Sequence, residues 1–277
     1  VTDFVLVPFV VAVTAGGWPV LKSLGLVGFR SWLESDRVRV ESGLLSRRES
    51  EAPLARIQLV GVGRPLLRRL VGLETVEMAT GELTISRENA VTRGMVAPLV
   101  EIGGWRDLAR QLIGPVALGE TDLRRSSPYT KRRSMVRGTI ATAVVVGLAL
   151  VGSIWLDLGW WPPAAIAITG LGLTVGYSLA RYRVLGWSAD GDHVIVRRGV
   201  FSRRLSIVPI RKVQDVSITE TVFQRRLGIA TVEVDTAGIG ISSAGEIKAI
   251  DLAREDARAL ADHLVGTAAR IALPDGV

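Results

Sequence analysis

Two uncharged stretches constrain the fold of this chain more than any other feature of its sequence. Residues 138–156 and 162–180 each run for 19 residues without a charged side chain. A helix needs about 20 residues to cross about 30 Å of hydrocarbon at 1.5 Å per residue. The five residues between the stretches include Trp160 and Trp161, and tryptophan favours the headgroup level of a bilayer. The pattern predicts a membrane hairpin with a very short turn.

The charges around this hairpin predict its orientation. A pair of buried core helices in a soluble protein is the alternative, but no polar face recurs at helical spacing in either stretch. The turn contains one charged residue, Asp157. The outer flanks carry Lys131, Arg132, Arg133, Arg137, Arg181 and Arg183. Because basic residues favour the cytoplasmic side of a membrane, we expect the flanks inside the cell and the turn outside.

A third apolar segment occupies residues 1–29. Pro8–Val27 lies at nearly the same distance before Trp32 as the second hairpin helix lies before Trp187, so the two segments correspond. Lys22 then falls near a helix end, where its stem can extend to the membrane surface. We therefore predict three transmembrane helices. The chain begins where a first hairpin would be half complete, which predicts a further helix before it.

The remaining sequence contains an internal repeat with a period of 156 residues. The segment DRVRVESGLLSRRESEAPLARIQLV, from Asp36, aligns without a gap with DHVIVRRGVFSRRLSIVPIRKVQDV, from Asp192, and the match continues to residues 80 and 236. Roughly 17 of about 45 aligned positions are identical, which indicates a duplication. The predicted organisation is 1–29 a membrane helix, 30–115 a first module, 116–137 a basic cytoplasmic linker, 138–181 the hairpin, 182–267 a second module and 268–277 a tail.

Each repeat unit has the pattern of several strands followed by one helix. Val38 and Val40 alternate with polar residues, which is the period of a half-buried strand. Gly199 is expected in a tight turn, and Gly228 in a backbone conformation or close contact that suits only glycine. Helical patterns over 105–113 and 252–265 close the two units.

The segment SRRLSIVPIRKVQDVSITETVFQRRLGIATVEVDTAG, from Ser202 to Gly238, resembles the signature of bacterial pleckstrin-homology (PH)-like domains in membrane-flanked proteins of the YdbS/YdbT type. The resemblance covers the second unit almost end to end and the first more loosely. It implies two antiparallel sheets packed into a β-barrel or sandwich and capped by a C-terminal helix. The predicted fold class is thus an α+β membrane protein with three transmembrane helices and two PH-like modules. Members of this family are associated with bacterial envelope stress and resistance to antimicrobial peptides.

The residues available for catalysis are few. The chain has two histidines and no cysteine, and it lacks the nucleotide-binding and hydrolase motifs that place a nucleophile or a phosphate loop. His193 corresponds to Arg37 in the first unit, so we interpret it as a structural or exposed histidine rather than a general base. No catalytic, cofactor or metal site is predicted, and we expect a protein that is not an enzyme.

Arginine pairs recur at one offset and give the sharpest candidate site. Arg47 and Arg48 correspond to Arg203 and Arg204, and each pair follows a turn with an apolar residue, Leu45 or Phe201. An apolar tip flanked by cations suits shallow contact with an anionic leaflet, or docking on a protein, better than deep capture of a phosphate. The alternative is an ordinary solvated strand face.

Two functions remain open from the sequence. The first is a non-enzymatic protein of the bacterial cell membrane whose cytoplasmic modules bind the inner leaflet, another protein or each other in envelope defence. The alternative is a component of a transporter or exporter, although such proteins normally carry ionisable groups or broken helices within their spans. Nucleic acid is not an expected partner, because aromatic residues make up 5% of the chain and do not interleave with the basic ones.

Overall fold

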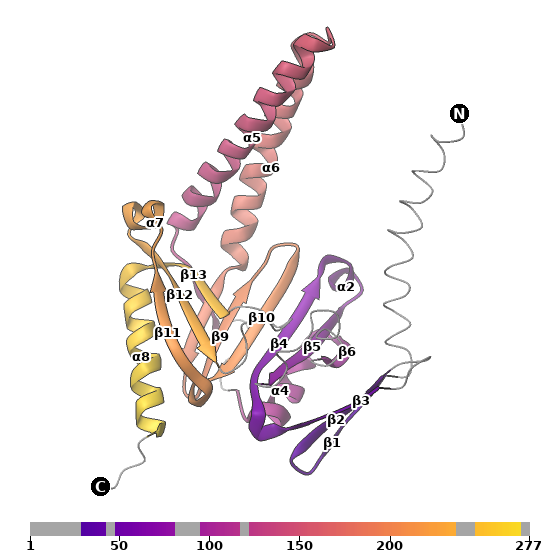
Figure 1. The fold of residues 1–277 in the computed structure, drawn as a ribbon, viewed down its shortest axis with the longest axis vertical. Coiled ribbons are helices and arrows are strands. Elements are labelled where there is room, and N and C mark those ends of the chain that lie inside the picture. Colours follow the sequence, from indigo (N-terminus) through magenta and orange to yellow (C-terminus); the bar gives the residue numbers. More distant parts are fainter. Residues whose placement is uncertain (1–28, 43–47, 81–94, 117–121, 237–246, 273–277) are drawn as a thin grey trace, which may run out of the picture.

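The structure is a computed structural model of the chain, and it describes residues 29–42, 48–80, 95–116, 122–236 and 247–272 (Figure 1). The first module contains β1 (Arg30–Glu34), β2 (Arg37–Ser42), β3 (Arg48–Pro53), η1 (Leu54–Arg56), β4 (Ile57–Pro65), α2 (Leu66–Leu70), β5 (Leu73–Thr80), β6 (Met95–Glu101) and α4 (Trp105–Ile113). The connection and hairpin contain β7 (Arg124–Arg125), α5 (Tyr129–Trp155) and α6 (Trp161–Val184). The second module contains β8 (Gly186–Asp190), β9 (His193–Arg198), β10 (Ser202–Pro209), η3 (Ile210–Lys212), β11 (Val213–Thr219), α7 (Val222–Leu227), β12 (Ile229–Thr236), β13 (Ile247–Ala253) and α8 (Arg254–Ala272).

The two modules repeat the same order of elements. Each has three strands, a 3₁₀ turn, a strand, a short helix, two more strands and a closing helix, so the predicted β-rich unit with a terminal helix is confirmed. Gly72 and Gly228 end the short helices with φ of +72° and +63°, the left-handed region that favours glycine. A Cβ at Gly228 would meet open space, so its backbone conformation alone calls for glycine.

One sheet joins the two modules. Its strand order is β6-β5-β4-β10-β9-β8-β7, so β4 of the first module pairs antiparallel with β10 of the second, from Ser202 opposite Pro65 to Ile207 opposite Val60. The β1-β2-β3 and β11-β12-β13 sheets flank it. The antiparallel sheets expected in each module are present, but the described residues form no closed barrel, because a strand edge from each module joins the other.

Strands β9 and β10 supply side chains to two hydrophobic cores. Ile195, Leu205 and Ile207 are buried in the core of the first module, together with Trp105 of α4. The neighbouring residues Val194, Val196 and Val208 point to the opposite face and pack in the core of the second module with α8. Burial on both faces accounts for the consecutive apolar residues Val194–Val196 and Ile207–Val208.

Helices α5 and α6 are long and apolar enough to cross a membrane, by length and composition, and they extend from one end of the joined modules (Figure 1). They pack closely because Gly170 faces Thr142, where a Cβ would lie 2.6 Å from the threonine Cγ2, and Gly138 faces Thr174 in the same way. Close approach at small residues is typical of membrane helix pairs. The third span expected at Pro8–Val27 lies outside the described residues, which contain two such helices.

Candidate membrane-contact site

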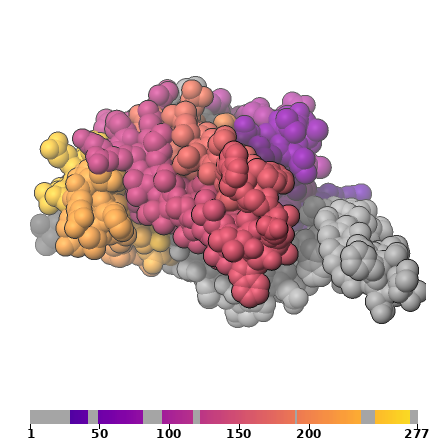
Figure 2. Space-filling model, turned by 90° about the horizontal axis from the view of Figure 1, so that it is seen from above, coloured from indigo at the N-terminus to yellow at the C-terminus, as the bar shows by residue number. Residues whose placement is uncertain are grey.

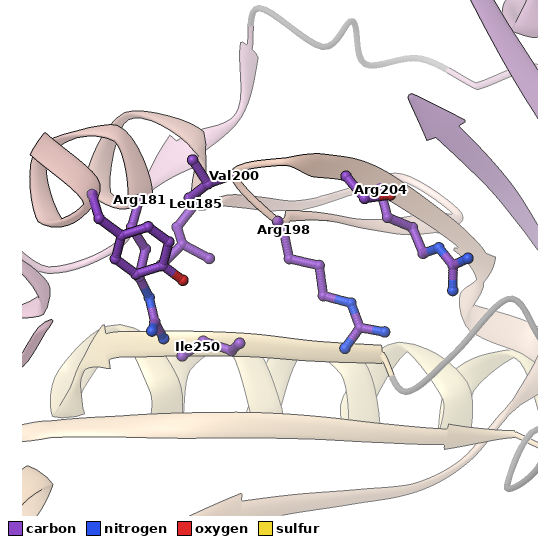
Figure 3. A pocket seen from close by; sticks show the side chains of 9 residues that line it. Arg181, Leu185, Arg198, Val200, Arg204 and Ile250 are labelled. Atoms are coloured by element: carbon purple, nitrogen blue, oxygen red, sulfur yellow. The ribbon is translucent and has the colours of Figure 1, made fainter. Parts of the chain in front are cut away.

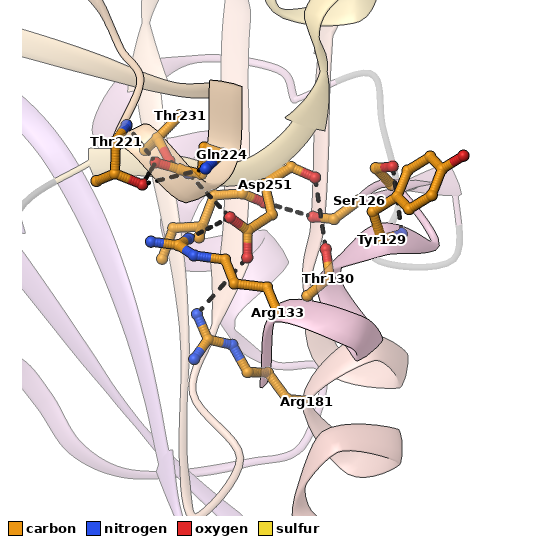
Figure 4. A network of polar contacts seen from close by, with 11 residues as sticks. Ser126, Tyr129, Thr130, Arg133, Arg181, Thr221, Gln224, Thr231 and Asp251 are labelled. Atoms are coloured by element: carbon orange, nitrogen blue, oxygen red, sulfur yellow. Dashed lines mark hydrogen bonds and ion pairs between the residues drawn. The ribbon is translucent and has the colours of Figure 1, made fainter. Parts of the chain in front are cut away.

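A buried carboxylate connects the second module to both apolar helices (Figure 4). Asp251 of β13 is 1% exposed and lies in the left-handed region with φ of +58°, beside an irregularity in the pairing of β12 with β13. Its side chain forms ion pairs with Arg133 of α5 and with Arg181 of α6, the latter at 3.9 Å. Buried charges require such partners, and an irregular strand can redirect a side chain in this way. The junction therefore holds the helices to the module.

The backbone around Asp251 adds further contacts with the start of α5. The Ser126 hydroxyl donates to the carbonyl of Ile250 at 2.8 Å, and the Ser127 N–H donates to the carbonyl of Asp251 at 2.9 Å. Both serines are buried. The second half of the expected 116–137 linker is therefore not a loose connection, since α5 begins at Tyr129, directly after these bonds.

Helix α7 is fixed to the same carboxylate. Its N-terminus has a capping box, in which Gln224 N–H donates to the Thr221 hydroxyl at 3.3 Å and Thr221 N–H donates to Gln224 Oε1 at 3.0 Å. The amide nitrogen of Gln224 then donates to Asp251 Oδ1 at 3.0 Å and to the Thr231 hydroxyl at 2.9 Å. Arg254 bonds both carboxylate oxygens of Glu220, just before α7, and this hydrogen bonding lowers the Glu220 pKa.

The turn between β9 and β10 places Phe201 beside α6. Phe201 is 64% exposed and stacks on Tyr177, with ring centroids 6.0 Å apart. Gly199 shapes the turn with φ of +86°, and a Cβ there would overlap the backbone carbonyl oxygen of Ser202. Phe201 is thus held at the end of the modules from which the apolar helices extend.

The arginines of the candidate contact surface have different positions. Arg204 lies near Glu77 of β5 at 3.8 Å, and burial raises the pKa of Glu77 against the lowering effect of Arg204. Arg203 is half-buried in β10 opposite Arg64 of the first module. Leu45 and Arg47 lie outside the described residues, and for Arg48 only its backbone place at the start of β3 is described. The structure therefore places Phe201 beside α6, and Arg203 and Arg204 on β10 where the two modules meet.

A pocket of about 300 Å³ opens between α6, the β9–β10 turn and β13 (Figure 3). Arg181 and Arg198 extend toward the strand that carries Ile250, and Arg204 lies farther along the same wall. Arg181 is close to Asp251 and Arg204 is close to Glu77, so acidic side chains already accompany two of these cations.

Two short helices carry exposed apolar side chains at the same end of the molecule. Phe223 of α7 is 65% exposed and Leu67, its counterpart in α2, is 79% exposed. Viewed from the hairpin end, α7 and the first module lie on either side of α5 and α6 (Figure 2). In the side view, α2, α7 and the β9–β10 turn all point toward the end where the helices emerge (Figure 1). Their tips form the apolar part of the candidate site.

Sequence reasoning expected a short amphipathic piece ending at Gly228, but it assigned neither this piece nor Asp251 to a site. The capping box was visible as Thr221 followed three residues later by Gln224, just before an amphipathic segment. Asp251 had no local signal, because its partners Arg133 and Gln224 lie far away along the chain.

The described titratable groups form no arrangement typical of catalysis. His193 is buried, and its Nε2 lies 3.4 Å from the carbonyl oxygen of Ile113. Burial lowers the pKa of His193, so the neutral ring is favoured. Within the described part of the chain, no group of three or more His, Cys, Asp or Glu side chains could hold a metal ion.

Comparison with known proteins agrees with this architecture. The sequence model of the bacterial PH domain family matches residues 1–115 and 135–267. The transmembrane protein YdbT of Bacillus subtilis (strain 168) is 22% identical over 220 residues, which cover 79% of this chain and 42% of that protein. The chain thus spans less than half the length of this relative. No solved structure matches the chain. The chain is a membrane-associated protein that belongs to the bacterial PH domain family.

Proposed function

We propose that this chain is a non-enzymatic platform whose joined PH-like modules rest on the inner leaflet of the bacterial cell membrane. One observation carries the proposal: the exposed apolar tips of α2, α7 and the β9–β10 turn lie on the side from which α5 and α6 extend (Figure 1). When a bilayer surrounds α5 and α6, these tips are therefore the part of the modules nearest its surface.

The energetics favour contact once the helices are inserted. Full burial of one large apolar side chain contributes about 1.5–3 kcal/mol, and each basic side chain near an anionic leaflet contributes about 1 kcal/mol. Each contact alone is weak, but α5 and α6 tether the tips to the membrane and so raise their effective concentration there. The Asp251 junction supports this proposal, because it limits how far the second module can turn away from the helices.

Quenching by lipids that carry a spin label tests the contact directly. The chain has no native cysteine, so single cysteines at Leu67, Phe201 and Phe223 can carry a fluorophore in the full-length protein reconstituted in vesicles. We expect quenching at all three tips and none at Asp107 or Asp262, which are exposed on α4 and α8. Tips that are quenched no more than the two control positions would refute the platform.

The orientation is tested with an impermeant thiol reagent on intact cells. Leu158→Cys in the exposed turn between α5 and α6 should react from outside, and Asp262→Cys should react only after lysis. Leu158 is preferable to the neighbouring Gly159, whose φ of +73° would strain a cysteine. The reverse pattern of labelling would place the modules outside the cell.

The biological process is proposed from the family resemblance alone. We propose a role in envelope stress or in resistance to antimicrobial peptides. Cells that lack the protein should then be more sensitive to a cationic antimicrobial peptide, and the wild-type gene should restore resistance. Equal sensitivity with and without the protein would remove this role and leave the platform itself unaffected.

A further inference from the structure

A second pocket lies between α5 and α7 and combines basic with apolar side chains. Its volume is about 550 Å³. Its lining combines four arginines with apolar side chains: Arg132, Arg133, Val136, Arg137, Ile140, Thr221, Phe223, Arg226 and Leu227. The described lining contains no acidic residue, so the pocket carries a strong positive charge.

Three of the four arginines are available to an anion. Arg133 is held by Asp251. Arg132, Arg137 and Arg226 are exposed, and none of them forms an ion pair with a residue in the described part of the chain. Guanidinium groups bind phosphate oxygens through charge-assisted hydrogen bonds, often two at a time.

The apolar half of the pocket continues into the membrane span. Arg137 is the last charged residue before the uncharged stretch of α5, and Ile140 lies one turn further along it. Ile140 and Phe223 are 57% and 65% exposed, so the pocket leaves large apolar surfaces uncovered. A ligand that fits must therefore be anionic at one end and apolar at the other, across the boundary between headgroups and hydrocarbon.

We propose that this pocket binds an anionic phospholipid. Arg132, Arg137 and Arg226 hold its phosphate, and its glycerol backbone and first methylene groups lie along Ile140 and Phe223. This site deepens the proposed platform and rests on it, since lipid reaches the pocket only if α7 lies at the leaflet. The pocket holds one lipid molecule, whereas the apolar tip of the β9–β10 turn makes shallow contact with the leaflet.

Two comparisons within the molecule favour this pocket. In the pocket beside α6, Arg181 and Arg204 lie near Asp251 and Glu77, so an anion there would compete with carboxylates. In α2, the counterpart of α7, Leu70 stands at the position of Arg226, so the first module lacks this cation.

The pocket is also organised in advance. The capping box of α7 and the bond from Gln224 to Asp251 fix α7 beside α5 without any ligand. A lipid therefore binds without a large cost of ordering the protein.

Native mass spectrometry of the full-length protein in detergent micelles tests the site with phosphatidylglycerol and phosphatidylcholine at equal concentration. The wild type should retain phosphatidylglycerol preferentially. Arg137→Gln with Arg226→Gln should weaken this binding roughly thirtyfold, which corresponds to about 2 kcal/mol at about 1 kcal/mol per arginine. The matched control, Arg110→Gln with Arg270→Gln, removes the same charge from exposed positions on α4 and α8 and should bind as the wild type does.

Further arms identify the source of the phosphate. Phe223→Ser should also weaken phosphatidylglycerol binding, whereas glycerol 3-phosphate at millimolar concentration should not displace the lipid. Displacement would show a site for small anions and overturn the lipid assignment. Equal retention of the two lipids, or equal phosphatidylglycerol binding by the wild type and the Arg137/Arg226 variant, would also overturn it.

The spin-label quenching at Leu67 and Phe201 reports on the platform separately. Quenched tips without a preference for phosphatidylglycerol would keep the platform and reject the pocket. A preference for phosphatidylglycerol with unquenched Leu67 and Phe201 would reject the full platform and confine the membrane contact to α7 and its pocket.

Discussion

The joining of the two modules through β4 and β10 can be broken by one substitution taken from the repeat itself. Ile207 of β10 is fully buried in the core of the first module. Its counterpart in the first module, 156 residues earlier, is Glu51. Ile207→Glu therefore places a carboxylate where the modules meet. The equivalent position of the first module carries a glutamate already.

The expected cost is large compared with the stability of a domain. Truncation of a buried isoleucine to alanine costs about 2–5 kcal/mol, and an unpaired buried carboxylate costs several kcal/mol more. Glu51 avoids this cost because it is partly exposed and bonds Arg37 at 2.7 Å. The glutamate in Ile207→Glu avoids this cost only if β10 separates from β4. The face of β10 that carries residue 207 is then exposed to water. We therefore expect the modules to separate, and each to keep the part of its core that its own strands and helix supply.

Hydrogen exchange of the full-length protein in detergent, read by mass spectrometry, distinguishes separation from unfolding. In Ile207→Glu, amides that bond between β4 and β10 should exchange roughly a thousandfold faster, as expected for a loss of about 4 kcal/mol. Amides of β12 should stay protected. Val208→Glu is the matched control, because Val208 faces the core of the second module and its replacement should expose β12. Unchanged protection of 202–209 in Ile207→Glu, or equal loss of β12 protection in both variants, would refute the two-faced strand.

Three other predictions use positions with internal controls. Gly170→Leu should separate α5 from α6 and lower the thermal stability in detergent by several degrees, whereas Gly172→Leu, which meets open space, should not; equal effects would contradict the helix packing. Gly199→Ala should distort the β9–β10 turn and reduce lipid quenching at its tip, and Gly191→Ala, which has a positive φ but open space, should cost only about 1–2 kcal/mol. Because burial lowers the folded-state pKa of His193 below its usual 6.5, stability should fall as the pH drops below about 6.5; His193→Gln should remove this part of the slope, and identical slopes would contradict it.

The sequence predicts the parts of this fold that depend on short-range pattern. The uncharged stretches predict α5 and α6, and the repeat predicts the matching order of elements in the two modules. Phe201 was found because a turn residue flanked by arginines is visible locally. The same reasoning could not place Arg204 against Glu77, because that contact joins two modules that the repeat treats as separate units.

The positions that differ between the two repeats, rather than those they share, indicate that the modules join. Leu59 of β4 corresponds to Asp215 of β11, and Leu59 packs in the core of the second module. Its neighbour Gly61 is buried as well, whereas the β11 residues are mostly exposed. An alignment scored on shared residues gives no weight to such positions. A change from a polar to an apolar residue in an edge strand nevertheless indicates that the edge is buried.

The differences between the repeats also decide which strand edges of the two modules associate. The first module uses its β4 edge and the second uses its β10 edge, and buried apolar side chains meet there, with Leu205 opposite Val62 and Ile207 opposite Val60. The equivalent of β10 in the first module is β3, which pairs only with β2 among the described strands. On that face Arg39 lies 3.3 Å from Glu49 and 3.2 Å from Glu51. A module that docked on β3 as the first module docks on β10 would bury these charges, and charged edge strands are a known defence against such pairing.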